Sequence, residues 1–347
     1  MIVRIAVALA TVVSSVALPP VTAVAASVQA APGNHDKGFW LPAHDEEVSF
    51  VVDGTTTYGT LHVPARLRGE RLRAALLLPG SGPTDRDGNQ LPSLTPNTLR
   101  DLALVLGRDR VVTLRFDKYG TGRTGLGEWA GRPQELDHPA FVRQAAAARD
   151  YLRDRGEVAP RRVALAGHSE GALTALVLAA DAPRDRRTAA LILLQPLALR
   201  MLDVLATQLH DQTRQLVESG GMSEEDGRVV DRAIDVAVAD LRGGRPVDTT
   251  AMPPALAALF GSLAGPSRRF VTSLDAVFPP DVARRLPPMP VLLTCGELDP
   301  QVPCQATDQL ASVVGHRVVL PGVGHAMTTA DGTFSPVLTS RLGALRW

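Results

Sequence analysis

The stretch GHSEG at residues 167–171 decides the fold of this chain, because it separates two apolar runs of different character. The run RVALA at residues 162–166 predicts a strand, and the Ala- and Leu-rich residues 171–180 predict a helix. A strand that turns at once into a helix strains the backbone at Ser169, and the residues two before and two after must be small to pack together. We therefore expect Ser169 to present its hydroxyl as a nucleophile; the alternative is a glycine-rich turn without chemistry.

Signals for strands and helices alternate on both sides of this turn. Two β-rich segments flank Asp53-Gly54-Thr55 and predict an antiparallel hairpin, residues 48–52 and 58–63. Further strands are predicted at residues 74–78, 111–116, 189–194, 291–295 and 317–320. Helices are predicted at residues 98–107, 139–156, 303–314 and 336–345. Such repeated β-α units predict an α/β fold with a mostly parallel central sheet flanked by helices.

This rhythm is interrupted between the strand that ends near Leu194 and the strand that begins at Val291. Residues 197–287 contain no convincing strand but three helical patterns, at residues 199–219, 223–242 and 254–263. The sequence therefore predicts a core of residues 46–196 and 288–347 with a helical cap inserted as residues 197–287. The Leu, Ala, Val and Met side chains of the insertion suit an apolar acyl pocket, or they pack the cap onto the core.

A nucleophilic serine needs a base and an acid, and the chain offers both after residue 290. A neutral hydroxyl is a poor nucleophile until a histidine accepts its proton. His325 follows the last predicted strand in GVGHAM, and the order serine, acid, histidine is the one expected for such a turn. Asp299 follows an earlier strand and would orient the imidazole; Glu297 is its rival. His168 should point away from the serine hydroxyl, so we interpret it as structural.

The reaction also needs donors for a developing oxyanion. The first expected donor is the backbone N–H of Glu170, the residue after the nucleophile. The second is the N–H of Ser81, in the loop PGSGP at residues 79–83 that follows a predicted strand. An ordinary Gly-Pro turn is the alternative for this loop, but its place in the strand order argues against it.

Composition excludes several classes of protein. The chain has 347 residues, of which 45% are apolar and 21% charged, typical of a globular domain with a sizeable core. The formal net charge is zero and no basic stripe is present, so a nucleic-acid partner is not expected. Lysine is confined to Lys37 and Lys118, which we interpret as a compositional bias towards arginine.

The N-terminal residues 1–30 are typical of a signal peptide. Arg4 supplies a positive charge, and residues 5–18 form an apolar segment too short for a comfortable membrane span. Small residues follow, and we expect cleavage between Ala25 and Ala30; the alternative is an uncleaved anchor. The mature protein is expected to be secreted or to lie in the cell envelope, with no stable membrane span.

The two cysteines, Cys295 and Cys304, are a candidate disulfide, since an exported protein can keep one. Spacing alone leaves open a buried Cys295 and an unrelated Cys304, because pairing requires Cα atoms within about 7 Å. If they pair, the bridge would brace the loop that carries Asp299.

These motifs together resemble a group of bacterial α/β-hydrolase serine carboxylesterases. The matching blocks cover the chain from about Val48 to the C-terminus, except in the helical insertion, and comprise GSGPTDRDGN at 80–89, FDKYGTG at 116–122, GHSEG at 167–171, and residues 296–303 and 324–325. The resemblance implies the α/β-hydrolase fold and a cap over the site. It also implies a triad of Ser169, Asp299 and His325.

One position departs from that group, because Tyr119 stands where related sequences usually carry arginine. The change could alter a loop ion pair to Asp85 or Asp87. We expect Asp85, Arg86 and Asp87 to hold the oxyanion loop by ion pairs and hydrogen bonds, although binding of substrate is an alternative.

The expected activity is hydrolysis of small-molecule acyl esters through an acyl-enzyme, without a metal or organic cofactor. The histidines and cysteines lack the spacing of zinc ligands. An amidase, a peptidase or an acyltransferase could use the same triad, and a binding protein on an inactive hydrolase scaffold is a further alternative. The sequence predicts neither the natural substrate nor the oligomeric state.

Overall fold

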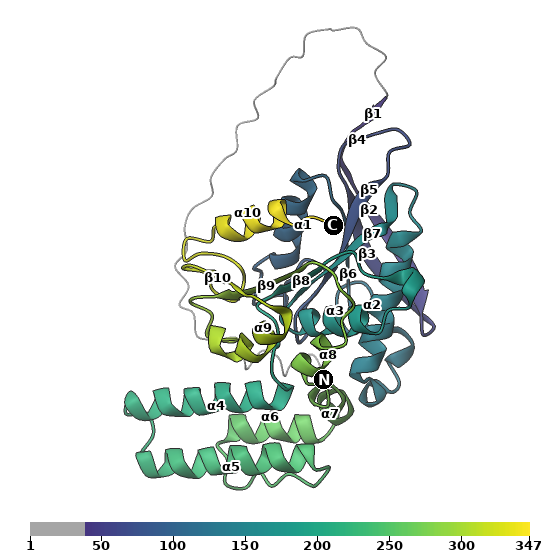
Figure 1. The fold of residues 1–347 in the computed structure, drawn as a ribbon. Coiled ribbons are helices and arrows are strands. Elements are labelled where there is room, and N and C mark those ends of the chain that lie inside the picture. Colours follow the sequence, from purple (N-terminus) through teal and green to yellow (C-terminus); the bar gives the residue numbers. More distant parts are fainter. Residues whose placement is uncertain (1–38) are drawn as a thin grey trace.

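A computed structural model describes residues 39–347, so the predicted signal peptide lies outside the described residues. The main feature is an eight-stranded sheet with the strand order β10-β9-β8-β7-β5-β6-β3-β2 (Figure 1). β2 and β3 form the predicted antiparallel hairpin, and β3 pairs antiparallel with β6. All other pairs in this sheet are parallel. The strands are β2 His44–Val52, β3 Thr55–Val63, β5 Leu72–Leu78, β6 Val112–Phe116, β7 Val158–His168, β8 Leu191–Leu194, β9 Val291–Gly296 and β10 Val318–Leu320.

The parallel strands are buried because helices cover both faces of the sheet. Strand β5 illustrates this: Leu76 packs into one apolar cluster and its neighbour Leu77 into another, since successive side chains point to opposite faces. The first cluster includes residues of α2 (His138–Arg153), α3 (Glu170–Ala180) and α9 (Asp308–Val314). The second includes residues of α1 (Thr98–Arg108) and α10 (Pro336–Ala344). This confirms the predicted fold class, a mostly parallel sheet flanked by helices.

The segment between β8 and β9 is helical, as expected. Three helices share an apolar cluster separate from the sheet, α4 (Met201–Glu218), α5 (Glu224–Arg242) and α6 (Pro254–Ala264), which lie together at one end of the molecule in Figure 1. Buried Asp275 joins them to the chain that returns to the sheet. It accepts a hydrogen bond from the N–H of Leu202 at 2.9 Å and pairs with Arg242 at 2.8 Å.

Two helices near the end of this segment were not expected from the sequence. α7 (Arg268–Asp275) has only eight residues, and α8 (Pro279–Ala283) begins with two prolines, which are tolerated in the first turn of a helix. Val282 of α8 belongs to the apolar cluster of the sheet. The last part of the insertion therefore packs with the core.

Smaller differences occur at both ends of the described chain. Strand β2 begins at His44, slightly before the expected start of the core, and a two-stranded ribbon pairs β1 (Trp40–Leu41) with β4 (Arg66–Leu67). The expected helix at 303–314 is a 3-10 turn, Cys304–Thr307, followed by α9. None of the helices in residues 39–347 combines the length and apolar character that crossing a bilayer requires.

Candidate active site

Ser169 lies at the turn between β7 and α3 with φ 55° and ψ −121°, a backbone region that residues other than glycine rarely adopt. Glycines make this turn sterically possible. A Cβ atom on Gly167 would collide with the backbone of Gly171, and one on Gly171 would collide with the carbonyls of Leu78 and Pro79. Gly167, two residues before the serine, must therefore be small to pack against Gly171, as expected. Gly171, two residues after the serine, must be small because the end of β5 lies against it.

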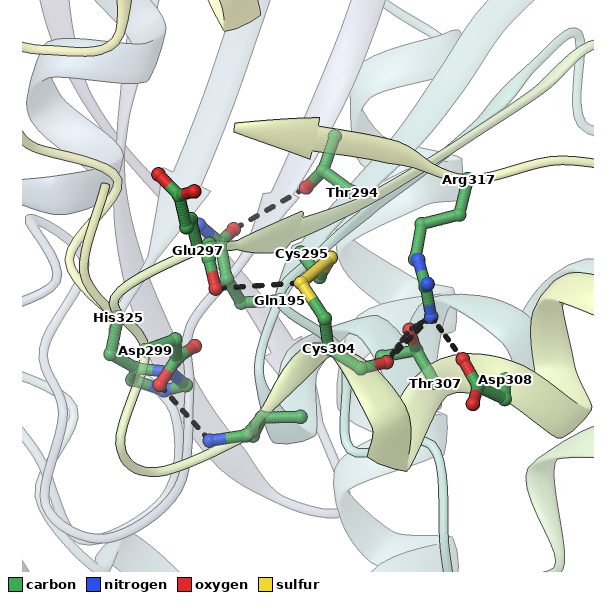
Figure 2. The surroundings of a disulfide bond; sticks show 12 residues. Gln195, Thr294, Cys295, Glu297, Asp299, Cys304, Thr307, Asp308, Arg317 and His325 are labelled. Atoms are coloured by element: carbon green, nitrogen blue, oxygen red, sulfur yellow. Dashed lines mark hydrogen bonds and ion pairs between the residues drawn. A yellow bond between two sulfur atoms is a disulfide. The ribbon is translucent and has the colours of Figure 1, made fainter. Parts of the chain in front are cut away.

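His325 and Asp299 face each other across two loops (Figure 2). The Nδ1 atom of His325 lies 2.7 Å from Oδ2 of Asp299, whose side chain is fully buried. The other carboxylate oxygen accepts backbone N–H bonds from Gln301 at 2.8 Å and Val302 at 3.0 Å. The acid is therefore held rigidly, and because a carboxylate only accepts, it selects the His325 tautomer with a proton on Nδ1.

The rival acid, Glu297, lies on the surface and has another partner. Its Oε2 accepts the N–H of Gly322 at 2.8 Å, which links the end of β9 to the loop after β10. A Cβ atom on Gly296 would collide with the carbonyl of Val323, so glycine is needed where these two loops approach. Glu297 therefore shapes the loop that carries His325 and is not its hydrogen-bond partner.

His168 contacts the candidate base directly, a role that the sequence did not indicate. The two rings lie 4.7 Å apart, and Nε2 of His168 is 2.8 Å from the backbone carbonyl of His325. Burial lowers the pKa of His168 to about 3, so its ring is neutral at pH 7 and donates from Nε2 to that carbonyl. His168 is structural as expected, and the element that it holds is the loop of His325.

Gln195 is a second residue that sequence reasoning missed. It directly follows β8, is fully buried and has a φ of 41°. Its Nε2 donates to the carbonyl of Gly324 at 3.4 Å, and its Oε1 accepts from the Thr294 hydroxyl at 3.4 Å. A polar residue directly after a fully apolar strand is the signal that could have identified it, since a buried amide needs partners.

A disulfide joins Cys295 and Cys304, whose Cα atoms are 5.2 Å apart. It connects the end of β9 to the first turn after the acid loop, and Asp299 lies between the two cysteines in the sequence. Figure 2 shows the bridge beside the loop that carries Asp299. Arg317 adds a further tie by donating to the carbonyl of Cys304 at 2.6 Å. The structure therefore brings the two cysteines together around the loop that they were expected to brace.

One expected oxyanion donor, Glu170, directly follows the serine, and the loop of the other, Ser81, meets the serine at Gly80. Glu170 is the first residue of α3, so its N–H has no acceptor within the helix. Gly80 lies against the serine: a Cβ atom on it would be 3.3 Å from Cβ of Ser169. The carbonyl of Ser81 accepts hydrogen bonds from Thr84 Oγ1 at 2.6 Å and Gln90 Nε2 at 3.1 Å, which fixes the loop.

Two charged residues of the loop after β5, Arg86 and Asp87, form ion pairs with Asp117, which directly follows β6, and with Arg115 of β6. Arg86 pairs with Asp117 at 2.7 Å, and Asp87 pairs with Arg115 at 2.7 Å. Asp85 accepts two backbone N–H bonds from within the loop, both at 2.9 Å. These contacts are those expected of residues that hold the oxyanion loop.

Tyr119 takes no part in these ion pairs. It is buried, it packs against Trp129 and Phe141, and its hydroxyl donates to the carbonyl of Val52 at 3.3 Å. Burial raises the pKa of Tyr119 to about 12. The tyrosine ring therefore fills an aromatic cluster, and its hydroxyl contacts Val52, not Asp85 or Asp87.

Comparison with known proteins agrees with this architecture. Residues 75–334 match the Alpha/beta hydrolase family, so the chain belongs to that family. Comparison with curated protein sequences gives no significant match.

Among solved structures, Est1E from Butyrivibrio proteoclasticus with ferulic acid bound is similar, with 19% identity, a TM-score of 0.51 and coverage of 86% of this chain and 96% of that chain. The esterase Pf2001 from Pyrococcus furiosus has 13% identity and a TM-score of 0.55, over 87% of this chain and 90% of that chain. The alpha/beta hydrolase GrgF from Penicillium sp. sh18 has 21% identity and a TM-score of 0.51, over 88% and 100%. At sequence identities this low, the similarity shows only that the fold is shared.

Proposed function

We propose that this protein is a secreted serine hydrolase that cleaves carboxylic esters through an acyl-enzyme. The observation that carries the proposal is the 2.7 Å hydrogen bond from His325 to a buried Asp299, in a fold that holds Ser169 in a strained strand-to-helix turn. A serine, an acid and a histidine in this chain order and setting are the parts that nucleophilic acyl transfer requires. The names of the esterases to which the fold is similar add support for an ester substrate.

In the proposed reaction, Nε2 of His325 accepts the hydroxyl proton as Oγ of Ser169 bonds to the ester carbonyl carbon. The N–H groups of Ser81 and Glu170 stabilise the oxyanion. The His325 imidazolium, held by Asp299, then gives its proton to the leaving alcohol as the carbon–oxygen bond breaks. Water repeats the sequence with the same base, which releases the acid and restores the serine.

We also propose that the helices after β8 act as a cap over the site. Gln208 of α4 donates to the carbonyl of Gln301 at 2.8 Å, so the insertion contacts the loop of the proposed acid. Secretion is proposed from the N-terminal pattern of residues 1–30, and the disulfide is consistent with an oxidising compartment. The mass of the mature protein from culture medium tests cleavage between Ala25 and Ala30.

The decisive experiment combines a covalent probe with a substrate series. Fresh, folded protein is treated with a fluorophosphonate, and p-nitrophenyl esters of graded acyl length are compared with aminoacyl amides. We expect labelling at Ser169 and faster turnover of esters than of amides. Ser169→Ala should remove both labelling and turnover without changing the melting temperature.

Two results would contradict the proposal. Absence of labelling in the folded wild-type protein would exclude a serine hydrolase, and labelling that persists in Ser169→Ala would place the nucleophile elsewhere. Amide turnover that exceeds ester turnover would instead make the protein an amidase or peptidase with the same triad.

A further inference from the structure

Lys118 is a buried cation close to the proposed nucleophile. It lies two residues after β6, and its Nζ donates to the carbonyl of Gly80 at 2.6 Å. The same atom lies 3.8 Å from Oε1 of Glu170, and both side chains are almost entirely buried. Burial lowers the pKa of Lys118, and the neighbouring carboxylate opposes that shift. A buried ammonium is costly unless it is paired, and Glu170 and the Gly80 carbonyl are the partners of this one.

The sheet order explains why these three residues meet. Strand β5 lies between β6 and β7, and all three strands run parallel. Gly80 follows β5, Lys118 follows β6 and Glu170 follows β7 after the serine, so all three lie at the same edge of the sheet. Neighbouring strands are about 4.8 Å apart, a distance that one lysine side chain can span.

The hydrogen bond to Gly80 determines where the next N–H points. In a trans peptide the carbonyl and the following N–H point in opposite directions, and the Gly80–Ser81 bond is not cis. With the Gly80 carbonyl directed at Lys118, the Ser81 N–H is directed away from Lys118. Gly80 itself borders the serine, since a Cβ atom on it would lie 3.3 Å from Cβ of Ser169.

Glu170 contributes to the proposed oxyanion site through both its backbone and its side chain. Its backbone N–H is one proposed oxyanion donor, and its carboxylate holds the ammonium that orients the other. An ammonium on the Gly80 carbonyl also polarises that peptide, which strengthens its neighbouring N–H as a donor.

We propose that Lys118 is a positioning residue for the oxyanion site. It fixes the Gly80–Ser81 peptide so that the Ser81 N–H meets the developing oxyanion, and Glu170 fixes Lys118 in turn. This inference rests on the proposed serine hydrolase activity.

The choice of lysine fits this role. Lys37 and Lys118 are the only lysines among 36 basic Lys and Arg residues, so arginine is this chain's ordinary cation. A compact ammonium can sit on one carbonyl, whereas a planar guanidinium needs room for a fork of donors.

The test removes the ammonium and measures transition-state stabilisation separately from substrate binding. Lys118→Met keeps the length of the side chain, and the double variant Lys118→Met/Glu170→Gln avoids leaving a buried carboxylate unpaired. Arg149→Met is the matched control, because Arg149 is a buried cation paired with Asp150 in α2. For each variant, kcat and KM for a p-nitrophenyl ester, the Ki of a boronic acid analogue and the melting temperature are measured.

We expect kcat to fall about 100-fold in both Lys118 variants, with KM changed less than about threefold. The Ki of the boronic acid should rise in parallel with the loss of kcat, because the analogue uses the same oxyanion donors. Arg149→Met should lower the melting temperature and leave kcat within about threefold of the wild type.

Two outcomes would overturn the assignment while the wild type remains active. One is a folded double variant with kcat within about threefold of the wild type. The other is a lower kcat with an unchanged boronic acid Ki, because the loss would then lie outside the oxyanion site. An inactive wild type would overturn the proposed function and this inference together.

Discussion

Replacing Asp299 by asparagine tests the proposed triad most directly, because the surroundings of this carboxylate determine how an amide must lie. One oxygen accepts two backbone N–H bonds, from Gln301 and Val302, and the other meets Nδ1 of His325. An amide that turned its NH₂ towards the two N–H groups would lose two buried hydrogen bonds, at about 1–3 kcal/mol each. The NH₂ of the introduced amide must therefore face His325, which forces Nδ1 to be an acceptor and places the ring proton on Nε2.

With its proton on Nε2, the histidine can no longer accept one from Ser169. We expect kcat to fall by about 10⁴, on the order of 5 kcal/mol of transition-state stabilisation, with KM little changed. The assay is p-nitrophenyl ester hydrolysis, with melting temperature as a check on folding. Glu297→Gln is the matched control, since Glu297 contacts Gly322 and not His325, and its kcat should stay within about threefold. A loss smaller than about tenfold for Asp299→Asn, or an equal loss for Glu297→Gln, would refute the reasoning.

Two further predictions concern stability. Replacing Cys295 and Cys304 together by serine should lower the free energy of unfolding by about 2.5 kcal/mol, because the bridge closes a short loop in the unfolded chain. Urea unfolding measures this change, and an unchanged midpoint would contradict the prediction. His168 has a pKa of about 3 in the folded protein, well below that of an unfolded histidine. The unfolded chain therefore binds one more proton between about pH 6.5 and pH 3, so stability should fall with decreasing pH, by up to about 1.4 kcal/mol per unit. His168→Gln, whose amide can still donate to the His325 carbonyl, should show a shallower slope between pH 7 and 4.

Local patterns account for much of the agreement between sequence and structure. Buried parallel strands are apolar on both faces, so residues 74–78 of β5 and all of β8 appear as continuous apolar runs. The elbow was predictable because Gly167 packs against Gly171 within one strand-turn-helix unit, although the contact of Gly171 with the end of β5 was not. Short helices such as α8 were missed because five residues carry too little periodicity to detect.

The hydrogen bonds and ion pairs between distant residues were not predictable in the same way. The sequence did not show that the ring of Tyr119 packs in an aromatic cluster, or that Arg115 of β6 pairs with Asp87. The scarcity of lysine was visible in the composition, but nothing local distinguished Lys118 as the residue that reaches Gly80.

The sequence by itself determined the serine turn, the order of the candidate triad and the sheet that supports them, because these follow from steric demands and apolar periodicity over short stretches. Only the tertiary structure decided which side chains complete the site. His168 meets the His325 carbonyl across 157 residues, and Lys118 meets Gly80 across 38, because the strand order places their loops at one edge. Hydrogen bonds between distant residues depend on that three-dimensional neighbourhood, which no local pattern encodes.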